Sequence, residues 1–340
     1  MQKQVYTDQN VVDEVERTRW KKIGQTLIKD WRLYVLLVPM LVFLFCFKYL
    51  PIKGILTAFK WGNDGAMYND NWCGFHWVYE VLNGYYSQMF WRAFRNTFVN
   101  SMYGLIFGFP IPIILALLFS EIKNQSYRSF LQVCCYLPHF VSLVVVTQII
   151  RTWAQGPLNS FQGGILYQMI SLFDSSAVGK NILETHPKYF RPIYQISGIW
   201  ESAGYGSIVY FAAILAISPT SYEAARIDGA SKLQQIRYVT FPGMAPTLTI
   251  MLIMRIGQIL NIGYEKIILL VGDSESAVYE TSDVISTFVY RLGIPKDGAS
   301  GASSAAQVGI VMDLFNAIIA MCLVLGANAI SRRVSSTSLF

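Results

Sequence analysis

The chain has 340 residues, of which 53% are hydrophobic and only 14% are charged, against about 25% charged residues in soluble domains. This deficit argues against an ordinary soluble globular protein and favours a chain that lies mostly in lipid. The formal net charge of +6 comes without a basic stripe interleaved with exposed aromatic residues, so the composition gives no sign of nucleic-acid binding.

The first segment, residues 1–32, is polar and basic, and its end carries Trp20 and Trp31 among several lysines and arginines. We predict that it lies in the cytoplasm. It could be a short basic helix on the anionic inner surface of the membrane or an unstructured tail.

Six apolar runs follow, each close to the roughly 20 residues that a helix needs to cross a bilayer. Lipid leaves the open edge of a sheet without hydrogen-bond partners, so the runs are predicted to be helices. The expected fold class is an all-α membrane protein with six transmembrane helices in one domain, 33–330. The runs lie at about 33–52, 97–119, 130–153, 193–217, 245–271 and 305–330.

The distribution of lysine and arginine predicts the orientation. If the N-terminus is cytoplasmic, the inner segments carry about twice the density of basic residues that the outer segments carry. Both termini, including a C-terminal tail at 331–340, and a polar hairpin at 218–243 are therefore expected to face the cytoplasm.

Two outer segments have features of their own. Segment 53–96 is rich in aromatic residues, which indicates either a membrane-interface belt or a surface that receives an external partner. In segment 272–304, Ser282 is expected to cap a short amphipathic helix, with Asp283 at the positive end of that helix.

Several spans contain polar or aromatic side chains, and ionisable residues in a span face protein or water because lipid exposure costs several kcal/mol. These side chains either line a water-accessible cavity that could bind a carbohydrate, or hold the bundle together through interhelical hydrogen bonds. In the fifth span, we expect the side chains of Arg255, Gln258, Asn261 and Glu265 to share one helical face. The candidate pathway residues are Trp200, Glu201, Tyr205, Gln258, Asn261, Tyr264, Glu265, Asp313 and Asn316.

The polar hairpin has strong local signals. Thr220 and Glu223 have the spacing of a capping box that starts a helix. Gly229 suits the left-handed position that ends this helix. A second short helix is expected from about Ser231, and Pro242 is expected to stop it. An ordered polar hairpin between two spans indicates a docking surface.

The hairpin residues Glu223-Ala224-Ala225, with Gly229 and Phe241-Pro242 at fixed distances, resemble the EAA motif. That motif marks permease subunits of bacterial ATP-binding-cassette importers that depend on an external binding protein. The usual ending has Ile and Leu where this chain has Val239 and Phe241. The stretch from Trp200 through Leu270 looks like the oligosaccharide and polysaccharide branch of these importers, which includes permeases for alginate- and pectin-derived chains.

The resemblance implies a type I importer permease of the bacterial inner or plasma membrane, with six helices. It also implies a second, distinct permease subunit, two cytoplasmic ATPase subunits, an external sugar-binding protein and an oligosaccharide substrate. The hairpin would enter a cleft on the ATPase, with Glu223 pairing with a basic residue there. The ATPase-coupling residues would be Glu223, Ala224, Ala225, Asp228, Gly229 and Pro242.

Cofactors are expected on the partners rather than on this chain. The chain has one Gly-Lys pair, Gly179-Lys180, and it lacks the rest of a phosphate-binding loop, so ATP and Mg would bind to the ATPase subunits. The sequence shows no pattern for a nucleophile with its base or for a metal cluster within a span, and this argues against an enzyme.

Two other function classes remain open at the level of sequence. An ion-coupled secondary transporter or channel would normally show inverted repeats or broken helices in paired halves. A membrane-embedded scaffold or sensor would explain a docking hairpin, but it would not need polar residues along several spans.

Overall fold

The computed structural model describes residues 29–61, 71–157, 162–177, 179, 181–272, 277–293 and 305–334. The regular structure of these residues is helical, apart from one isolated antiparallel bridge between Lys60 and Trp72. The prediction of an all-α fold is therefore confirmed. The predicted basic helix or tail at 1–28 lies outside the described residues.

The chain divides into two compact units, Met1–Thr57 and Ala58–Phe340. In the first unit, α2 (Trp31–Leu44) continues through a π-helical segment, Phe45–Tyr49, into a 3-10 segment, Leu50–Phe59, whose last two residues belong to the second unit. Residues 33–47 contain no charged side chain, which allows this helix to lie in hydrocarbon. The whole stretch Trp31–Phe59 is long and apolar enough to cross a membrane.

The second unit supplies three more long apolar helices within the described residues, Ser87–Glu121, Lys232–Gly257 and Ala305–Arg333. Two bent helix pairs bring the possible number of spans to six if each pair is one span. The first pair, Gln125–Phe140 with Leu143–Ala154, bends by 90°; the second, Pro187–Leu215 with Pro219–Ile227, bends by 69°. The upper count agrees with the six predicted spans, but the prediction of one helix over 130–153 is wrong, because the chain bends by 90° between Phe140 and Leu143.

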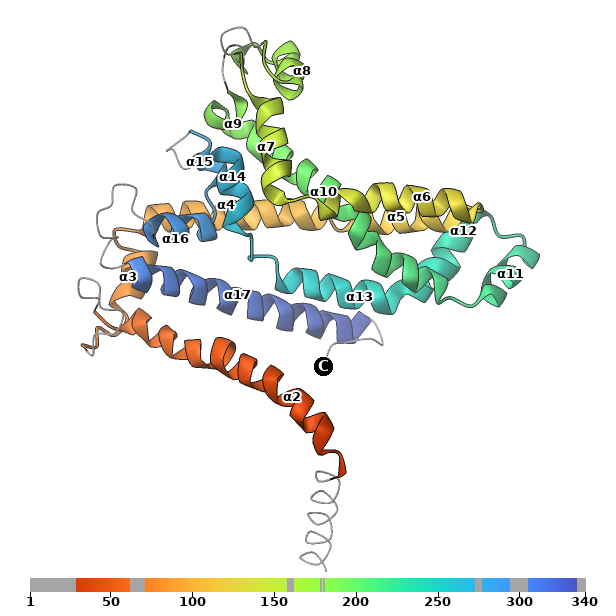
Figure 1. Cartoon of the computed structure of the whole chain (residues 1–340), viewed down its shortest axis with the longest axis horizontal. Helices are drawn as coiled ribbons and strands as arrows, with labels where there is room; N and C mark the ends of the chain where they lie inside the picture. Colours follow the sequence, from red (N-terminus) through yellow and green to blue (C-terminus); the bar gives the residue numbers. More distant parts are fainter. Residues whose placement is uncertain are drawn as a thin grey trace, which may run out of the picture. The chain divides into compact units, whose positions relative to one another are not determined.

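The helices of the second unit enclose three apolar clusters. Figure 1 shows how these helices are arranged. One cluster joins α5 (Pro110–Glu121), α10 (Pro187–Leu215) and α13 (Phe241–Gly257). Another joins α3 (His76–Leu82), α4 (Ser87–Ile106), α16 (Ile285–Gly293) and α17 (Ala305–Val334).

The third cluster lies around α7 (Leu143–Ala154), which follows α6 (Gln125–Tyr136) after the 90° bend. It includes residues of the short helices α8 (Ile165–Phe173) and α9 (Ile182–Thr185) and of α14 (Tyr264–Val271). Together α7, α8 and α9 form a lobe that extends away from α4 and α5 (Figure 1). The short helix α15 (Tyr279–Ser282) lies between α14 and α16 in the sequence.

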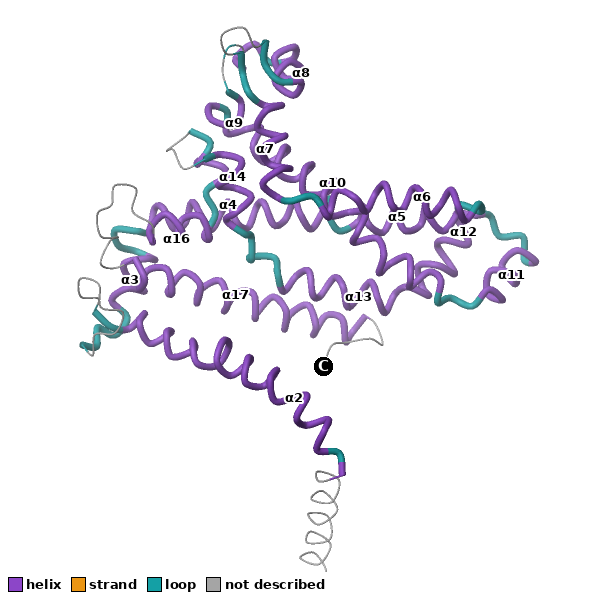
Figure 2. The backbone as a smooth tube through the Cα atoms, in the orientation of Figure 1, coloured by secondary structure: helices purple, strands orange, loops and turns teal. Residues whose placement is uncertain are grey.

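The prediction of one unbroken helix over 245–271 is wrong. Helix α13 ends at Gly257, α14 starts at Tyr264, and Gln258–Gly263 forms a loop between them (Figure 2). The backbone first tightens into three-residue turns, such as Gln258 N–H to the Arg255 carbonyl at 3.2 Å. The Ser286 hydroxyl of α16 then donates to the Ile262 carbonyl at 2.5 Å. Irregular backbone is tolerated at membrane depth where protein or a polar cavity satisfies it in this way.

Candidate functional site

The polar hairpin starts earlier than its sequence signals suggest. Helix α11 (Pro219–Ile227) begins at Pro219, whose fixed φ angle suits the first position of a helix. Its N-cap is Ser218, which makes no side-chain capping bond; the Ser218 hydroxyl instead lies 2.7 Å from that of Thr220. Because Thr220 is already inside the helix, the predicted Thr220–Glu223 capping box is wrong.

The predicted glycine turn of the hairpin is confirmed. Gly229 has a φ angle of +74°, in the left-handed region that side chains disfavour. Its N–H donates to the Arg226 carbonyl at 3.1 Å, and the Ala230 N–H donates to the Ala225 carbonyl at 2.9 Å. These two bonds make a Schellman motif, which ends α11 sharply and returns the chain towards the membrane.

The second helix of the hairpin, α12 (Lys232–Gln235), does have a capping box. The Ser231 hydroxyl accepts from the Gln234 N–H, and the Gln234 side chain accepts from the Ser231 N–H at 2.7 Å. The prediction that Pro242 stops this helix is wrong, because the helix continues to Gly257. A π-helical turn at Ile236–Thr240 shifts the hydrogen-bond register just before the proline, so the helix accommodates a residue without an N–H.

The hairpin exposes apolar side chains that the sequence analysis did not single out. Ile227 is 87% exposed and Leu233 79% exposed, beside the exposed Glu223, Ala224 and Asp228. These two side chains offer apolar contact area on an otherwise polar segment.

A cavity of about 320 Å³ lies between the hairpin and the adjoining span ends, and its lining includes Tyr222, Glu223 and Arg226. The Lys232 ammonium of α12 lies 2.6 Å from the Glu121 carboxylate at the end of α5. The Tyr222 hydroxyl lies 3.1 Å from that of Thr240. These contacts connect both arms of the hairpin to the helices that continue into the membrane.

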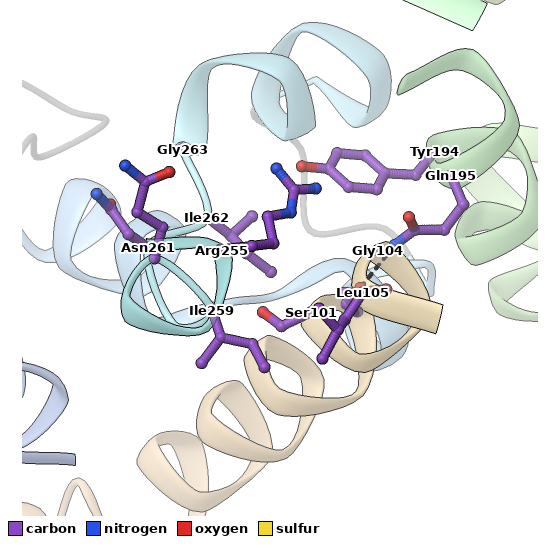
Figure 3. Close-up of a pocket in the computed structure, with 12 residues that line it drawn as sticks. Ser101, Gly104, Leu105, Tyr194, Gln195, Arg255, Ile259, Asn261, Ile262 and Gly263 are labelled. Carbon is purple, nitrogen blue, oxygen red and sulfur yellow. Dashed lines mark hydrogen bonds between the residues drawn. The ribbon is translucent and has the colours of Figure 1, made fainter. Parts of the chain in front are cut away.

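A second site lies where the fifth span breaks. A cavity of about 200 Å³ is lined by α4, α10, the end of α13 and the loop Gln258–Gly263. An adjoining cavity of about 300 Å³ shares four lining residues with the first. The shared residues are Gly104, Tyr194, Gln195 and Arg255. Figure 3 shows all four, with the guanidinium of Arg255 and the hydroxyl of Tyr194 pointing towards one another.

The structure brings only two of the predicted pathway residues, Gln258 and Asn261, to this cavity. The expected common helical face of Arg255, Gln258, Asn261 and Glu265 is wrong, because the helix ends at Gly257. Arg255, Gln258 and Asn261 still line the same cavity. The course of the loop brings them together, and not the regular spacing of residues along a helix.

The other predicted residues do not line the two cavities. Glu201 forms an ion pair with Lys266 at 2.9 Å, and Tyr264 stacks on Tyr290 with ring centroids 4.7 Å apart. Tyr205 stacks on His139 at 4.1 Å. Trp200 and Glu265 are exposed, as is Asp313 on α17, where Asn316 has a buried oxygen without a hydrogen-bond partner among the described residues.

Sequence analysis missed the residues that α4 and α10 contribute to the cavity. Asn100 and Ser101 fall within an apolar run, and their polarity was the one signal that could have identified them. Gln195 donates to the Asn100 carbonyl at 2.7 Å and so connects the two helices. Lys266, which lines the adjoining cavity, was also missed.

A buried charge cluster anchors the N-terminal end of α16. The Asp283 carboxylate is completely buried and accepts from Arg92 at 3.1 Å, Arg291 at 2.6 Å and the Thr287 hydroxyl at 2.9 Å. The expected cap at Ser282 is wrong, because Ser282 is the last residue of α15 and its buried hydroxyl has no hydrogen-bond partner among the described residues. The next residue, Asp283, pairs with Arg92 and Arg291, and these two arginines offset the burial of its charge.

A second acidic residue fixes the lobe of α7, α8 and α9. The Lys188 ammonium, together with the hydroxyls of Ser176 and Tyr189, holds the pKa of the Asp174 carboxyl well below its usual range. The contribution of this group to stability is therefore present above the usual carboxyl pKa and is lost as the pH falls through the lowered value. Among the residues described, no group of three His, Cys, Asp or Glu side chains could hold a metal ion.

The comparisons with known proteins agree over most of the chain. A family model described as the inner membrane component of binding-protein-dependent transport systems matches residues 108–336. Protein LplB of Bacillus subtilis is 32% identical over 92% of this chain and 92% of its own length. The polygalacturonan/rhamnogalacturonan transport system permease protein YteP of the same organism is 30% identical over 96% of this chain and 95% of its own length.

Solved structures extend the agreement to the fold. A chain of a bacterial ABC transporter involved in the import of the acidic polysaccharide alginate is 38% identical, covers 93% of this chain and all of its own length, and has a TM-score of 0.78. A chain of a bacterial alginate transporter in complex with a periplasmic protein that holds an alginate pentasaccharide has a TM-score of 0.77. It is 38% identical and covers 93% of this chain and 99% of its own length.

These matches confirm the resemblance carried by the EAA motif, in a chain whose helices are long and apolar enough for a membrane. The transport class, rather than an enzyme class, is also confirmed. The chain belongs to the family of inner membrane components of binding-protein-dependent transport systems.

Proposed function

We propose that this chain is the permease subunit of an ATP-driven importer for acidic oligosaccharides, delivered by an external binding protein. The observation that carries the proposal is the match of 38% identity over 93% of the chain to a transporter of the acidic polysaccharide alginate. The named function of YteP, transport of polygalacturonan and rhamnogalacturonan, points to the same class of substrate.

In this proposal the chain forms half of the translocation pathway in a bacterial inner or plasma membrane. A second permease subunit forms the other half, and two cytoplasmic ATPase subunits carry ATP and Mg. The exposed faces of Trp200, Tyr205 and Glu265 are suited to such a shared pathway, because in the isolated chain they are open to a partner or to water.

The hairpin is the proposed point of coupling. Glu223, Ala224, Ala225, Asp228 and Gly229 lie on or beside its exposed tip, and Ile227 and Leu233 add apolar contact area. Pro242 lies where the hairpin continues into the fifth span. Since α12 and that span form one continuous helix, a movement of the hairpin by the ATPase would reach the loop Gln258–Gly263 without a joint in between.

The rival function classes have less support. A broken span also occurs in ion-coupled secondary transporters, where broken helices normally come in paired halves of the fold. The family match from residue 108 to residue 336 favours the importer instead.

The test is reconstitution in proteoliposomes. We expect that the complex of this chain with its partner permease, ATPase and loaded binding protein accumulates a galacturonate or alginate trimer only when ATP is inside. Maltotriose, a neutral trimer, is the control and should be imported far more slowly. Accumulation of sugar by this chain alone, without ATPase subunits, would refute the proposal.

A further inference from the structure

The cavity at the broken span has an unbalanced positive charge. Arg255 lines both of its parts, and Lys266, which lines the larger part, is paired with Glu201 at 2.9 Å. Neither part is lined by an acidic residue, and no ion pair joins Arg255 to an acid within the described ranges. A cation within an apolar span is costly unless an anion or water accompanies it, so the cavity is suited to a negatively charged group.

The cavity also contains a buried amide that has no partner. Asn100 is only 1% exposed, and neither its Nδ2 nor its Oδ1 has a hydrogen-bond partner in the described part of the chain. The hydroxyl of the neighbouring Ser101 is likewise buried and unpartnered. Leaving such buried groups unpaired destabilises the folded chain. A ligand with hydroxyl groups would supply both donors and acceptors.

The loop after Arg255 adds a third feature. Gly263, which lines the cavity, is the N-cap of α14 and has no side chain with which to cap the helix. The first N–H groups of a helix lack intrahelical partners and carry a partial positive charge. The positive end of α14 therefore begins at the same cavity as the Arg255 guanidinium.

The size of the cavity limits what it can hold. Its first part, at about 200 Å³, is smaller than the roughly 300–1,000 Å³ of pockets for drug-sized ligands. It is therefore suited to one ring of a sugar chain rather than to a whole oligosaccharide. The planar guanidinium of arginine matches the two oxygens of a carboxylate.

We infer that this cavity is a carboxylate site within the membrane, in which Arg255 binds the carboxylate of one uronate residue and Asn100 bonds to the hydroxyls of that residue. Gln258 and Asn261 extend the site towards the loop. The inference rests on the proposed function, because it assigns a place in this chain where the acidic substrate is recognised after the binding protein has released it.

The test measures the number of sugar molecules imported per ATP hydrolysed in proteoliposomes with the complete importer and trigalacturonate as the probe. This ratio does not depend on the amount of folded protein. Arg255→Gln is expected to lower the ratio about tenfold, which corresponds to about 1.4 kcal/mol. Arg255→Lys keeps the charge without the planar fork and should give a smaller loss. Lys53→Gln removes an exposed charge that lines neither cavity and should leave the ratio unchanged.

Asn100→Asp is the independent variant, in case loss of Arg255 prevents assembly. It has nearly the same shape and places a competing carboxylate in the cavity, so it should also lower the ratio. A wild-type ratio in either assembled variant would overturn the inference while leaving the proposed function intact. If the wild-type importer takes up maltotriose but not trigalacturonate or an alginate trimer, the proposed function fails, and the carboxylate site fails with it.

Discussion

The polar hairpin and the broken fifth span follow one another in the chain, yet they are specified in different ways. The hairpin is built from short-range bonds, such as those between Gly229 and Arg226 and between Ser231 and Gln234. The loop Gln258–Gly263 has few local signals and depends on a distant hydroxyl, that of Ser286. Local changes should therefore damage the hairpin most, whereas changes far along the sequence should reach the loop.

The largest expected effect is that of Gly229→Pro in the hairpin. Proline cannot adopt a φ angle of +74° and removes the N–H that bonds to Arg226. Loss of this turn should reduce binding-protein-stimulated ATP hydrolysis and sugar uptake by roughly a hundredfold, which corresponds to about 3 kcal/mol of lost coupling. Sugar binding by the separate binding protein should not change.

The matched variant is Gly229→Asn, since asparagine tolerates the left-handed region better than other side chains do. It should retain most of the activity. If the proline variant still coupled ATP hydrolysis to uptake, the hairpin would not have the proposed role.

The second effect tests the buried charge cluster at the start of α16, the helix whose Ser286 bonds to the loop. Asp283→Leu leaves Arg92 and Arg291 without their buried partner, and this should cost about 3–5 kcal/mol of stability. Thermal unfolding of the reconstituted complex measures this loss. Glu184→Leu, at an exposed acid on α9, should change stability by only about 0.5 kcal/mol. Equal stability of the two variants would show that the cluster does not anchor α16.

The third effect separates two residues that the sequence placed on one helical face. Asn261 lines the cavity and Glu265 does not. Loss of one hydrogen bond in Asn261→Ala should cost about 1 kcal/mol, or roughly fivefold in uptake. Glu265→Ala should cost less. Unchanged uptake in both variants at normal expression would remove the loop from the substrate pathway.

A smaller effect is expected for Ser286→Ala, which removes the bond to the Ile262 carbonyl. Its loss should cost about 1 kcal/mol and speed amide hydrogen exchange in residues 262–264. Ser221→Ala, at an exposed serine of the hairpin, is the control and should leave exchange in the loop unchanged. Unaltered exchange in the Ser286 variant would mean that the loop is held by its own residues.

The smallest effect is that of Glu121→Gln, which breaks the pair with Lys232. Both side chains are exposed, so the pair should contribute only about 0.2–1 kcal/mol and less at high salt. The stimulated ATPase rate at low and high salt measures it. A large, salt-independent loss would show that this contact, rather than the turn at Gly229, positions the hairpin.

Much of the fold could be predicted, because the bilayer sets the length of each apolar run and forces backbone groups to bond within helices. The Gly229 turn was predictable for a local reason, since few residues adopt its φ angle. The effect of Pro242 was not, because the π-helical turn before it depends on how a whole helix continues into the membrane.

By itself, then, the sequence determined the all-helical class, the helix-forming apolar runs, the family resemblance and the hairpin turn. These depend on composition and on contacts between residues close in the chain. The tertiary structure decided the break at Gln258–Gly263 and the meeting of Asn100, Tyr194 and Arg255 around one cavity. The physical reason is that the helical period predicts which residues share a face only for residues within the same helix. Where a distant side chain such as Ser286 satisfies the backbone instead, packing chooses which polar groups converge.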